Sequence, residues 1–113
     1  MPSKRDPTEL LPLTPAMFHV MVALADGDTH GYAIMKDVEH LTGGAVRLST
    51  GTLYGIIKRL LSEGLVRESA SGDNERRRSY TLTAFGREVA RAEAARLEST
   101  LAVAKRKALF RRA

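Results

Sequence analysis

The chain has 113 residues, of which 43% are apolar and none is cysteine, so one folded domain is expected. The lack of cysteine excludes disulfides, thiol catalysis, iron–sulfur clusters and cysteine-ligated zinc. No apolar run reaches the roughly 18–20 residues of a membrane span, and the first residues lack the apolar core of a signal peptide. We therefore expect a cytoplasmic protein with no membrane partner.

The basic residues are concentrated in the second part of the chain. Residues 1–42 contain three basic and six acidic residues, residues 43–83 contain seven and four, and residues 84–113 contain eight and three. A basic surface attracts nucleic acid or anionic membranes without distinguishing between them. A solvated basic helix at the C-terminus is the alternative explanation for most of this excess.

The chain begins with a polar stretch and two helices. Residues 1–12 are polar and contain prolines, which predicts a flexible N-terminal arm. Thr14 can cap a helix whose first residue is Pro15, and helical spacing of apolar residues predicts this helix up to Ala25. A second helix is predicted over residues 31–41, before two consecutive glycines.

A third helix and a hairpin follow. Ser49 or Thr50 is expected to cap the third helix, which reaches Glu63 and has one continuous apolar face. Residues 65–68 and 79–82 are strand candidates, and the turn-rich sequence between them predicts a hairpin.

The last helix, predicted from a Thr83 cap to about Arg111, has a heptad pattern. Its apolar residues follow the spacing 4, 3, 4, 3, 4, and they are Ala90, Ala94, Leu97, Leu101, Ala104 and Ala108. A narrow stripe of this kind favours self-association, and folding back onto the same chain is the alternative.

Three helices followed by a hairpin predict a mainly α winged helix-turn-helix, in which the third helix enters the major groove of DNA. Residues 13–83 would form this DNA-binding domain, and residues 84–113 would form a dimerisation helix. The outer face of the third helix has no acidic residue before Glu63, and small hydroxyl residues at a helix start suit phosphate contacts. The DNA-contacting residues predicted in this region are Ser49, Thr50, Thr52, Tyr54 and Lys58.

The hairpin carries three consecutive arginines, Arg76, Arg77 and Arg78. Guanidinium groups bind phosphates and enter narrow minor grooves, so we predict that the hairpin contacts DNA. The alternative is an exposed edge strand that carries charge for solubility. Tyr32 is also predicted to contact DNA, although both Tyr32 and Tyr54 could serve only for packing.

Several segments resemble, in order, the PadR-type transcriptional regulators. They are residues 30–34 (HGYAI), 51–54 (GTLY), 58–60 (KRL), 63–66 (EGLV), 76–83 (RRRSYTLT) and Gly86. The resemblance implies a winged-helix homodimer, held by the C-terminal helix and part of the first helix, that represses genes until an effector binds. The short C-terminal segment is similar to the compact members of that family.

Two positions depart from that resemblance. Gly55 stands where many family members have Pro, and the chain lacks Trp, on which some compact members stack planar drugs at the dimer centre.

We find no pattern typical of an enzyme, a cofactor site or a metal site. The three histidines, His19, His30 and His40, lack the i, i+4 spacing of two metal ligands on one helix. The winged-helix prediction and the family resemblance together imply three partners: double-stranded DNA, a second copy of the chain, and a small-molecule effector at the dimer interface. The alternative function is a winged-helix adaptor whose basic helix binds an acidic protein without specific DNA recognition.

Overall fold

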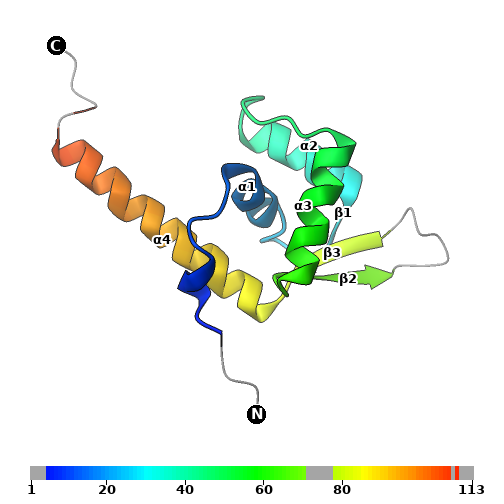
Figure 1. The fold of residues 1–113 in the computed structure, drawn as a ribbon. Helices are drawn as coiled ribbons and strands as arrows, with labels where there is room; N and C mark the ends of the chain where they lie inside the picture. The colour runs from blue at the N-terminus through cyan, green and yellow to red at the C-terminus, as the bar shows by residue number, and fades with distance from the viewer. Residues whose placement is uncertain (1–4, 71–77, 108, 110–113) are drawn as a thin grey trace.

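The computed structural model describes residues 5–70, 78–107 and 109, and it confirms a mainly helical fold with a small sheet (Figure 1). A 3-10 helix, four α-helices and three strands make up this part of the chain. They are η1 (Pro7–Leu10), α1 (Pro15–Ala23), β1 (Thr29–His30), α2 (Gly31–Leu41), α3 (Thr50–Ser62), β2 (Val66–Ala70), β3 (Arg78–Leu82) and α4 (Ala84–Arg106).

Side-chain caps define where three helices begin. The hydroxyl of Thr14 accepts the Met17 N–H of α1 at 3.2 Å, and the hydroxyl of Thr83 accepts the Gly86 N–H of α4 at 2.9 Å. Ser49 caps α3, so Ser49 and not Thr50 is the capping residue of the two that were predicted. Each hydroxyl satisfies a backbone donor that the helix itself leaves unpaired.

Helix ends were predicted less accurately than helix starts. The first helix ends at Ala23, two residues before the predicted Ala25, and the third helix ends at Ser62. The last helix ends at Arg106, whereas the sequence predicted about Arg111, which lies outside the described residues. Residues 31–41 form α2 as predicted.

The sheet contains a strand that the sequence did not indicate. Residues Thr29–His30 form β1, which pairs with β3, so the antiparallel sheet has the order β1-β3-β2. A two-residue strand is too short to show an alternating pattern, which explains why it was missed. Its consequence is that β3, which begins with Arg78, is the central strand and not an edge strand.

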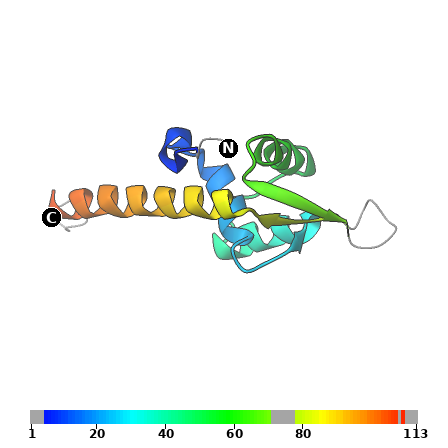
Figure 2. The ribbon, with the colours of Figure 1, turned by 90° about the horizontal axis from the view of Figure 1, so that it is seen from below.

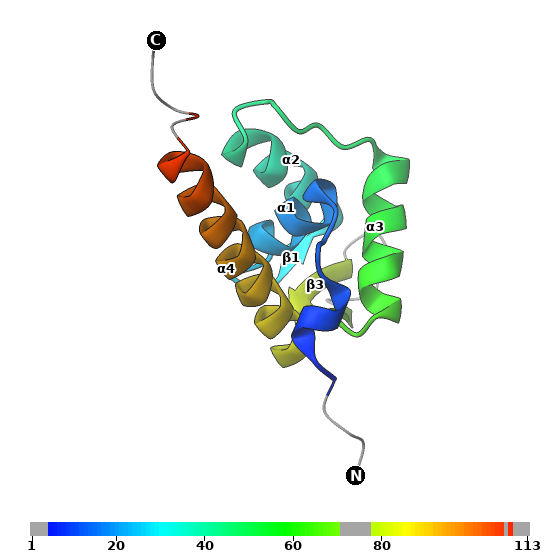
Figure 3. The same cartoon turned by 60° about the vertical axis from the view of Figure 1, so that its left-hand side comes forward.

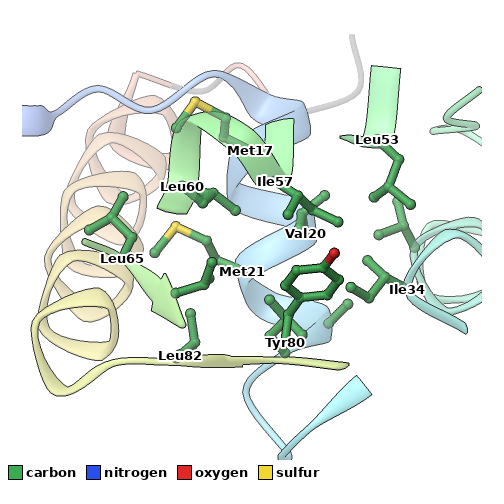
Figure 4. Close-up of a cluster of buried hydrophobic side chains, with 14 of the residues drawn as sticks. Met17, Val20, Met21, Ile34, Leu53, Ile57, Leu60, Leu65, Tyr80 and Leu82 are labelled. Atoms are coloured by element: carbon green, nitrogen blue, oxygen red, sulfur yellow. The ribbon is translucent and has the colours of Figure 1, made fainter. Parts of the chain in front are cut away.

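The core lies between α1, α2, α3 and the sheet (Figure 4). It is formed by apolar side chains from all of these elements, including Val20, Met21, Ile34, Leu53, Ile57, Leu60, Leu65, Tyr80 and Leu82. Gly86 at the start of α4 lies so close to the Leu65 carbonyl that a Cβ added there would overlap it. This contact holds α4 against the chain segment between α3 and β2.

The described part of the N-terminal arm is structured, which differs from the expected flexible arm. The Asp6 carboxylate accepts the Thr8 N–H at 2.9 Å and starts η1; bonds from Thr8 lower the pKa of Asp6. The segment lies between α3 and α4 (Figure 3). Partly buried Leu10 and Leu11 pack against the core, and this apolar anchoring explains the order.

The first half of α4 packs on the body of the protein, and its second half projects away from it (Figure 2). The molecule is consequently elongated, with extents of 58, 41 and 22 Å. The strands β2 and β3 extend on the other side of the body from the projecting helix.

Candidate nucleic-acid interface

Helix α3 separates its residues into a buried apolar face and an exposed polar face. Leu53, Ile57 and Leu60 are buried, at the spacing of one helical stripe. The exposed residues include four that were predicted to contact DNA, Thr50, Thr52, Tyr54 and Lys58, and also Arg59, which was not in that set. This exposed face contains no carboxylate, so it is neutral over its first half and basic in its second half, at Lys58 and Arg59.

The start of α3 is fixed by hydrogen bonds between two of the predicted site residues. Ser49 Oγ accepts the Thr52 N–H at 3.1 Å and donates to Thr52 Oγ1 at 2.9 Å. The Ser49 hydroxyl is thereby used in the cap. Because the Thr52 hydroxyl accepts the bond from Ser49, it can donate its own hydrogen to another acceptor, such as a phosphate oxygen.

Tyr54 connects α3 to the beginning of α2. Its hydroxyl end lies over Gly31, so closely that a Cβ at position 31 would overlap the hydroxyl oxygen. The ring remains 45% exposed. Of the two roles considered for Tyr54, packing is therefore observed, and contact with DNA stays a prediction.

Tyr32 follows Gly31 and is 68% exposed, which is unusual for a tyrosine that would serve only for packing. The ammonium group of Lys36, one turn later on α2, lies 5.5 Å from the centre of the Tyr32 ring. Lys36 was not predicted as a site residue. Its spacing of four from Tyr32 was the signal available in the sequence, because residues four apart share a helix face.

Of the three hairpin arginines, only Arg78 lies within the described residues; Arg76 and Arg77 lie outside them. The guanidinium of Arg78 is exposed and forms an ion pair of 2.9 Å with Glu68 on β2. β3 is the central strand of the sheet, but β1 pairs only with its residues Ser79 and Tyr80, so Arg78 is paired with β2 alone.

The inner face of β3 is part of the core. Tyr80 and Leu82 are buried and anchor the hairpin to the helices. Burial raises the pKa of the Tyr80 hydroxyl, and the nearby Glu68 carboxylate raises it further. Tyr80 is therefore not available to a DNA backbone.

The predicted heptad stripe is exposed over its middle. Leu97 and Leu101 are 40% and 43% exposed, and Ala94 is exposed too. Ala90 packs against the core, Ala104 is half-buried, and Ala108 lies outside the described residues. The stripe has not folded back onto its own domain from Ala94 to Leu101.

Two hollows flank Phe18 between α1 and α4. One has a volume of about 190 Å³ and is lined by apolar side chains together with Arg87 and Arg91. The other has a volume of about 240 Å³ and is lined by residues that include His19, Arg96 and Leu97. Both hollows are mostly apolar, and both open beside the stripe on α4.

Glu93, a residue that the sequence did not single out, is buried in α4 with 1% of its surface exposed. Its carboxylate accepts the Leu13 N–H at 2.9 Å and pairs with the Arg96 guanidinium. The hydrogen bond from Arg96 lowers the pKa of Glu93, although burial alone would raise it. The available signal was a carboxylate on the apolar side of the last helix, between Ala90 and Leu97.

Among the described residues, no group of three or more histidine, aspartate or glutamate side chains is close enough to hold a metal ion. Of the helices in these same ranges, none has both the length and the apolar character that a membrane span requires.

A family model described as "Transcriptional regulator PadR-like family" matches residues 20–92. The chain belongs to this PadR-like family. The description of this family is that of transcriptional regulators. The matched residues run from α1 through the first half of α4, so they include α3 and the hairpin.

A curated relative of this PadR-like chain is an uncharacterised 37.1 kDa protein in transposon TN4556 of Streptomyces fradiae. It is 43% identical over 79 residues, which are 70% of the chain, and the chain spans only 22% of that relative's length.

Solved structures of similar fold include a transcriptional regulator from Clostridium thermocellum, with a TM-score of 0.70, 26% identity, and coverage of 80% of this chain and 86% of that one. Bacillus subtilis PadR in complex with operator DNA has a TM-score of 0.62 and 20% identity, over 72% of this chain and 46% of that one. Bordetella bronchiseptica BpsR, whose DNA binding is regulated by 6-hydroxynicotinic acid, has a TM-score of 0.65 and 27% identity. The match covers 77% of this chain and 61% of that one.

Proposed function

We propose that the chain is a sequence-specific repressor that binds an inverted-repeat operator as a homodimer and responds to a small-molecule effector. The observation that carries the proposal is the exposed, acid-free face of α3 in a chain of this family. A helix placed in the major groove must present donors and cations to the DNA and keep carboxylates away from phosphates.

The start of α2 extends this candidate surface. The contact between Tyr54 and Gly31 brings α2 against α3, and Tyr32 and Lys36 lie on the exposed side of α2. An ammonium group beside a phenol hydroxyl is a suitable phosphate contact, because it adds charge to a hydrogen-bond donor. We propose that α3 reads base edges and that Tyr32, Lys36 and the hairpin arginines contact the backbone.

The homodimer is proposed from the exposed stripe on α4. Leu97 and Leu101 project from a helix that has left its own domain, so a second copy is the simplest partner to cover them. A two-fold axis through this helix would present two copies of α3, and the half-sites would be separated by about one turn of DNA, roughly 10 base pairs, or a multiple of it.

The effector is proposed to bind in the hollows between α1 and α4. Each hollow is smaller than the roughly 300 Å³ that a drug-sized ligand needs, and a second subunit packed on α4 would enlarge and close them. That the DNA binding of BpsR is regulated by a small carboxylic acid supports ligand control in a structure of similar fold.

Footprinting on the DNA upstream of its own gene, followed by titration of the protected site, tests the proposal. We expect protection of an inverted repeat and an affinity for it about a thousandfold above that for unrelated DNA at the same salt concentration. The logarithm of the affinity should fall linearly with the logarithm of salt concentration.

Equal affinity for unrelated DNA would contradict the proposal. Tight binding of an acidic protein from cell extract, combined with weak nonspecific DNA binding, would instead indicate the adaptor function. The exposed basic residues at the far end of α4, Lys105 to Lys107, would then be its binding surface.

A further inference from the structure

Glu93 lies at the point where α4 leaves the body of the protein. It is the last of the buried residues in that helix, after Gly86 and Val89. Every residue from Ala94 to Val103 is exposed. Any change in the direction of α4 at Glu93 is therefore passed to the whole projecting half of the helix.

The carboxylate of Glu93 connects α4 to the start of α1. It accepts the N–H of Leu13, which directly precedes the Thr14 cap of α1, across a sequence separation of 80 residues. On its other side it accepts two hydrogen bonds from Arg96, of which the bond between Arg96 Nη2 and Glu93 Oε2 is 3.1 Å long. Hydrogen bonds to a charged group fix a direction, whereas the surrounding apolar contacts allow sliding.

The same N-terminal segment has a second connection, to the end of α3. Arg5 pairs with the Glu63 carboxylate at 3.1 Å, and its guanidinium lies 4.6 Å above the Phe85 ring of α4. Residues 5–13 thus link the end of α3, through Glu63, to two residues of α4, Phe85 and Glu93.

Burying a carboxylate reduces stability because the charged group loses its hydration, which an apolar residue of the same size would not. Its directional bonds offer something that an apolar residue does not, which is a defined angle between two helices. The projecting residues 94–106 span about 20 Å, so a tilt of about 10° at Glu93 would move the far end by about 3 Å.

We propose that Glu93 is a positioning residue, which sets the direction of α4 relative to α3 and thereby the half-site separation that one dimer occupies. The second half of this statement rests on the proposed function, since it requires a DNA-binding dimer. The first half concerns one chain alone and is tested separately.

A distance measurement within one chain tests the direction of α4. The chain contains no cysteine, so spin labels can be attached at introduced cysteines, Asp37→Cys on α2 and Val103→Cys on α4, and the labelled protein diluted into unlabelled protein. We expect a narrow distance distribution, which broadens or shifts by about 3 Å in Glu93→Gln, as the lever estimate implies. Glu88→Gln, which removes an exposed carboxylate from the same helix, is the matched control and should leave the distribution unchanged.

A DNA series tests the consequence. Inverted repeats with different spacers are compared with a single half-site for the parent protein, Glu93→Gln and Glu88→Gln. In Glu93→Gln we expect single half-site affinity to stay within about twofold, while the preference for the best spacer over its neighbours falls at least about fivefold, since geometry governs linked binding.

Each result supports or contradicts the proposal. An unchanged distance distribution, or an equal loss of affinity at every spacer length, would show that Glu93 has no positioning role. If the parent protein prefers no inverted repeat, the proposed function fails, and the distance measurement still decides the role of Glu93. Should Glu93→Gln not fold, Arg96→Lys, which replaces the two-pronged contact by a single ammonium, should give the same changes with smaller amplitude.

Discussion

The helices α3 and α4 are both amphipathic, but they use their apolar faces differently. In α3 the apolar residues Leu53, Ile57 and Leu60 are all buried within the domain, and the polar face is exposed. In α4 the apolar face is buried only as far as Glu93, and Leu97 and Leu101 are exposed beyond it. The exposed side of α3 is polar and is well solvated by water. The exposed side of α4 is apolar, and such a surface is typical of a site that another molecule covers.

This difference assigns separate tasks to two ends of one small domain. Water stabilises the polar face of α3, so a ligand for that face must be polar or charged. Exposed leucine side chains are unfavourable in water, and the proposed homodimer would bury Leu97 and Leu101. Changes on α4 should therefore alter assembly, and changes on α3 should alter DNA binding without altering assembly.

The strongest test of this division is a charge in the stripe on α4. Leu101→Asp should convert the dimer into a monomer, because a carboxylate would be buried twice at the interface. Loss of linked binding should then weaken operator affinity by about 100-fold or more. Light scattering measures the mass, and an operator titration measures the affinity.

Val103→Asp is the control for this substitution, because Val103 is equally exposed but lies off the stripe. It should leave both mass and affinity unchanged. If Leu101→Asp remains a dimer, the exposed stripe is not the interface and the comparison between the two helices fails.

The next largest effect is expected where α4 is attached to the domain. A Cβ in Gly86→Ala would overlap the Leu65 carbonyl, and the forced shift should lower the free energy of unfolding by about 1–3 kcal/mol. In Gly55→Ala on α3 the added Cβ meets open space, so the higher helix propensity of alanine should raise that free energy by about 0.8 kcal/mol. Urea unfolding measures the free energy of unfolding of both variants. If Gly86→Ala raised this free energy as Gly55→Ala is expected to do, the close approach at Gly86 would be refuted.

A smaller effect is expected from removing one cation from α3. Lys58→Ala should weaken operator binding by about tenfold and reduce the slope of log affinity against log salt by about two, one phosphate for each subunit. Lys105→Ala removes an equally exposed lysine from the far end of α4 and should change neither quantity. If the two variants changed the affinity and the salt slope equally, α3 would not be the preferred DNA-binding helix.

The smallest effect concerns acid stability at the base of the projecting helix. Because the folded pKa of Glu93 lies below its ordinary value of 4.5, its ionised form stabilises the fold above that pH. The contribution declines as the pH falls below 4.5 and is lost once the pH passes through the lowered folded pKa. Unfolding measured from pH 7 to pH 3 should show a shallower acid loss for Glu93→Gln, and a curve parallel to that of the parent would contradict the assignment.

Much of the fold could be predicted because the local signals agree. The Thr14 and Thr83 caps and the apolar face of α3 each mark an element by residues close in sequence. Such local agreement is typical of sequences that specify one fold.

What the sequence did not reveal depends on contacts between distant residues. The pairing of β1 with β3, the bond between Leu13 and Glu93, and the contact of Arg5 with Glu63 each join segments far apart in the chain. No periodic pattern encodes such a contact, and a polar N-terminal segment by itself predicts only a loose arm. The predicted DNA-binding set remains a prediction, and Arg76 and Arg77 lie outside the described residues.

The fit between Gly31 and Tyr54 has a consequence for how sequences of this kind can diverge. A side chain of any size at position 31 is compatible with the present backbone only if the Tyr54 side chain moves away or is replaced by a shorter one. The two positions should therefore change as a pair, a small residue accompanying tyrosine and a larger one accompanying a shorter partner. Grafting a foreign recognition helix onto this scaffold would succeed only when both members of the pair are transferred together.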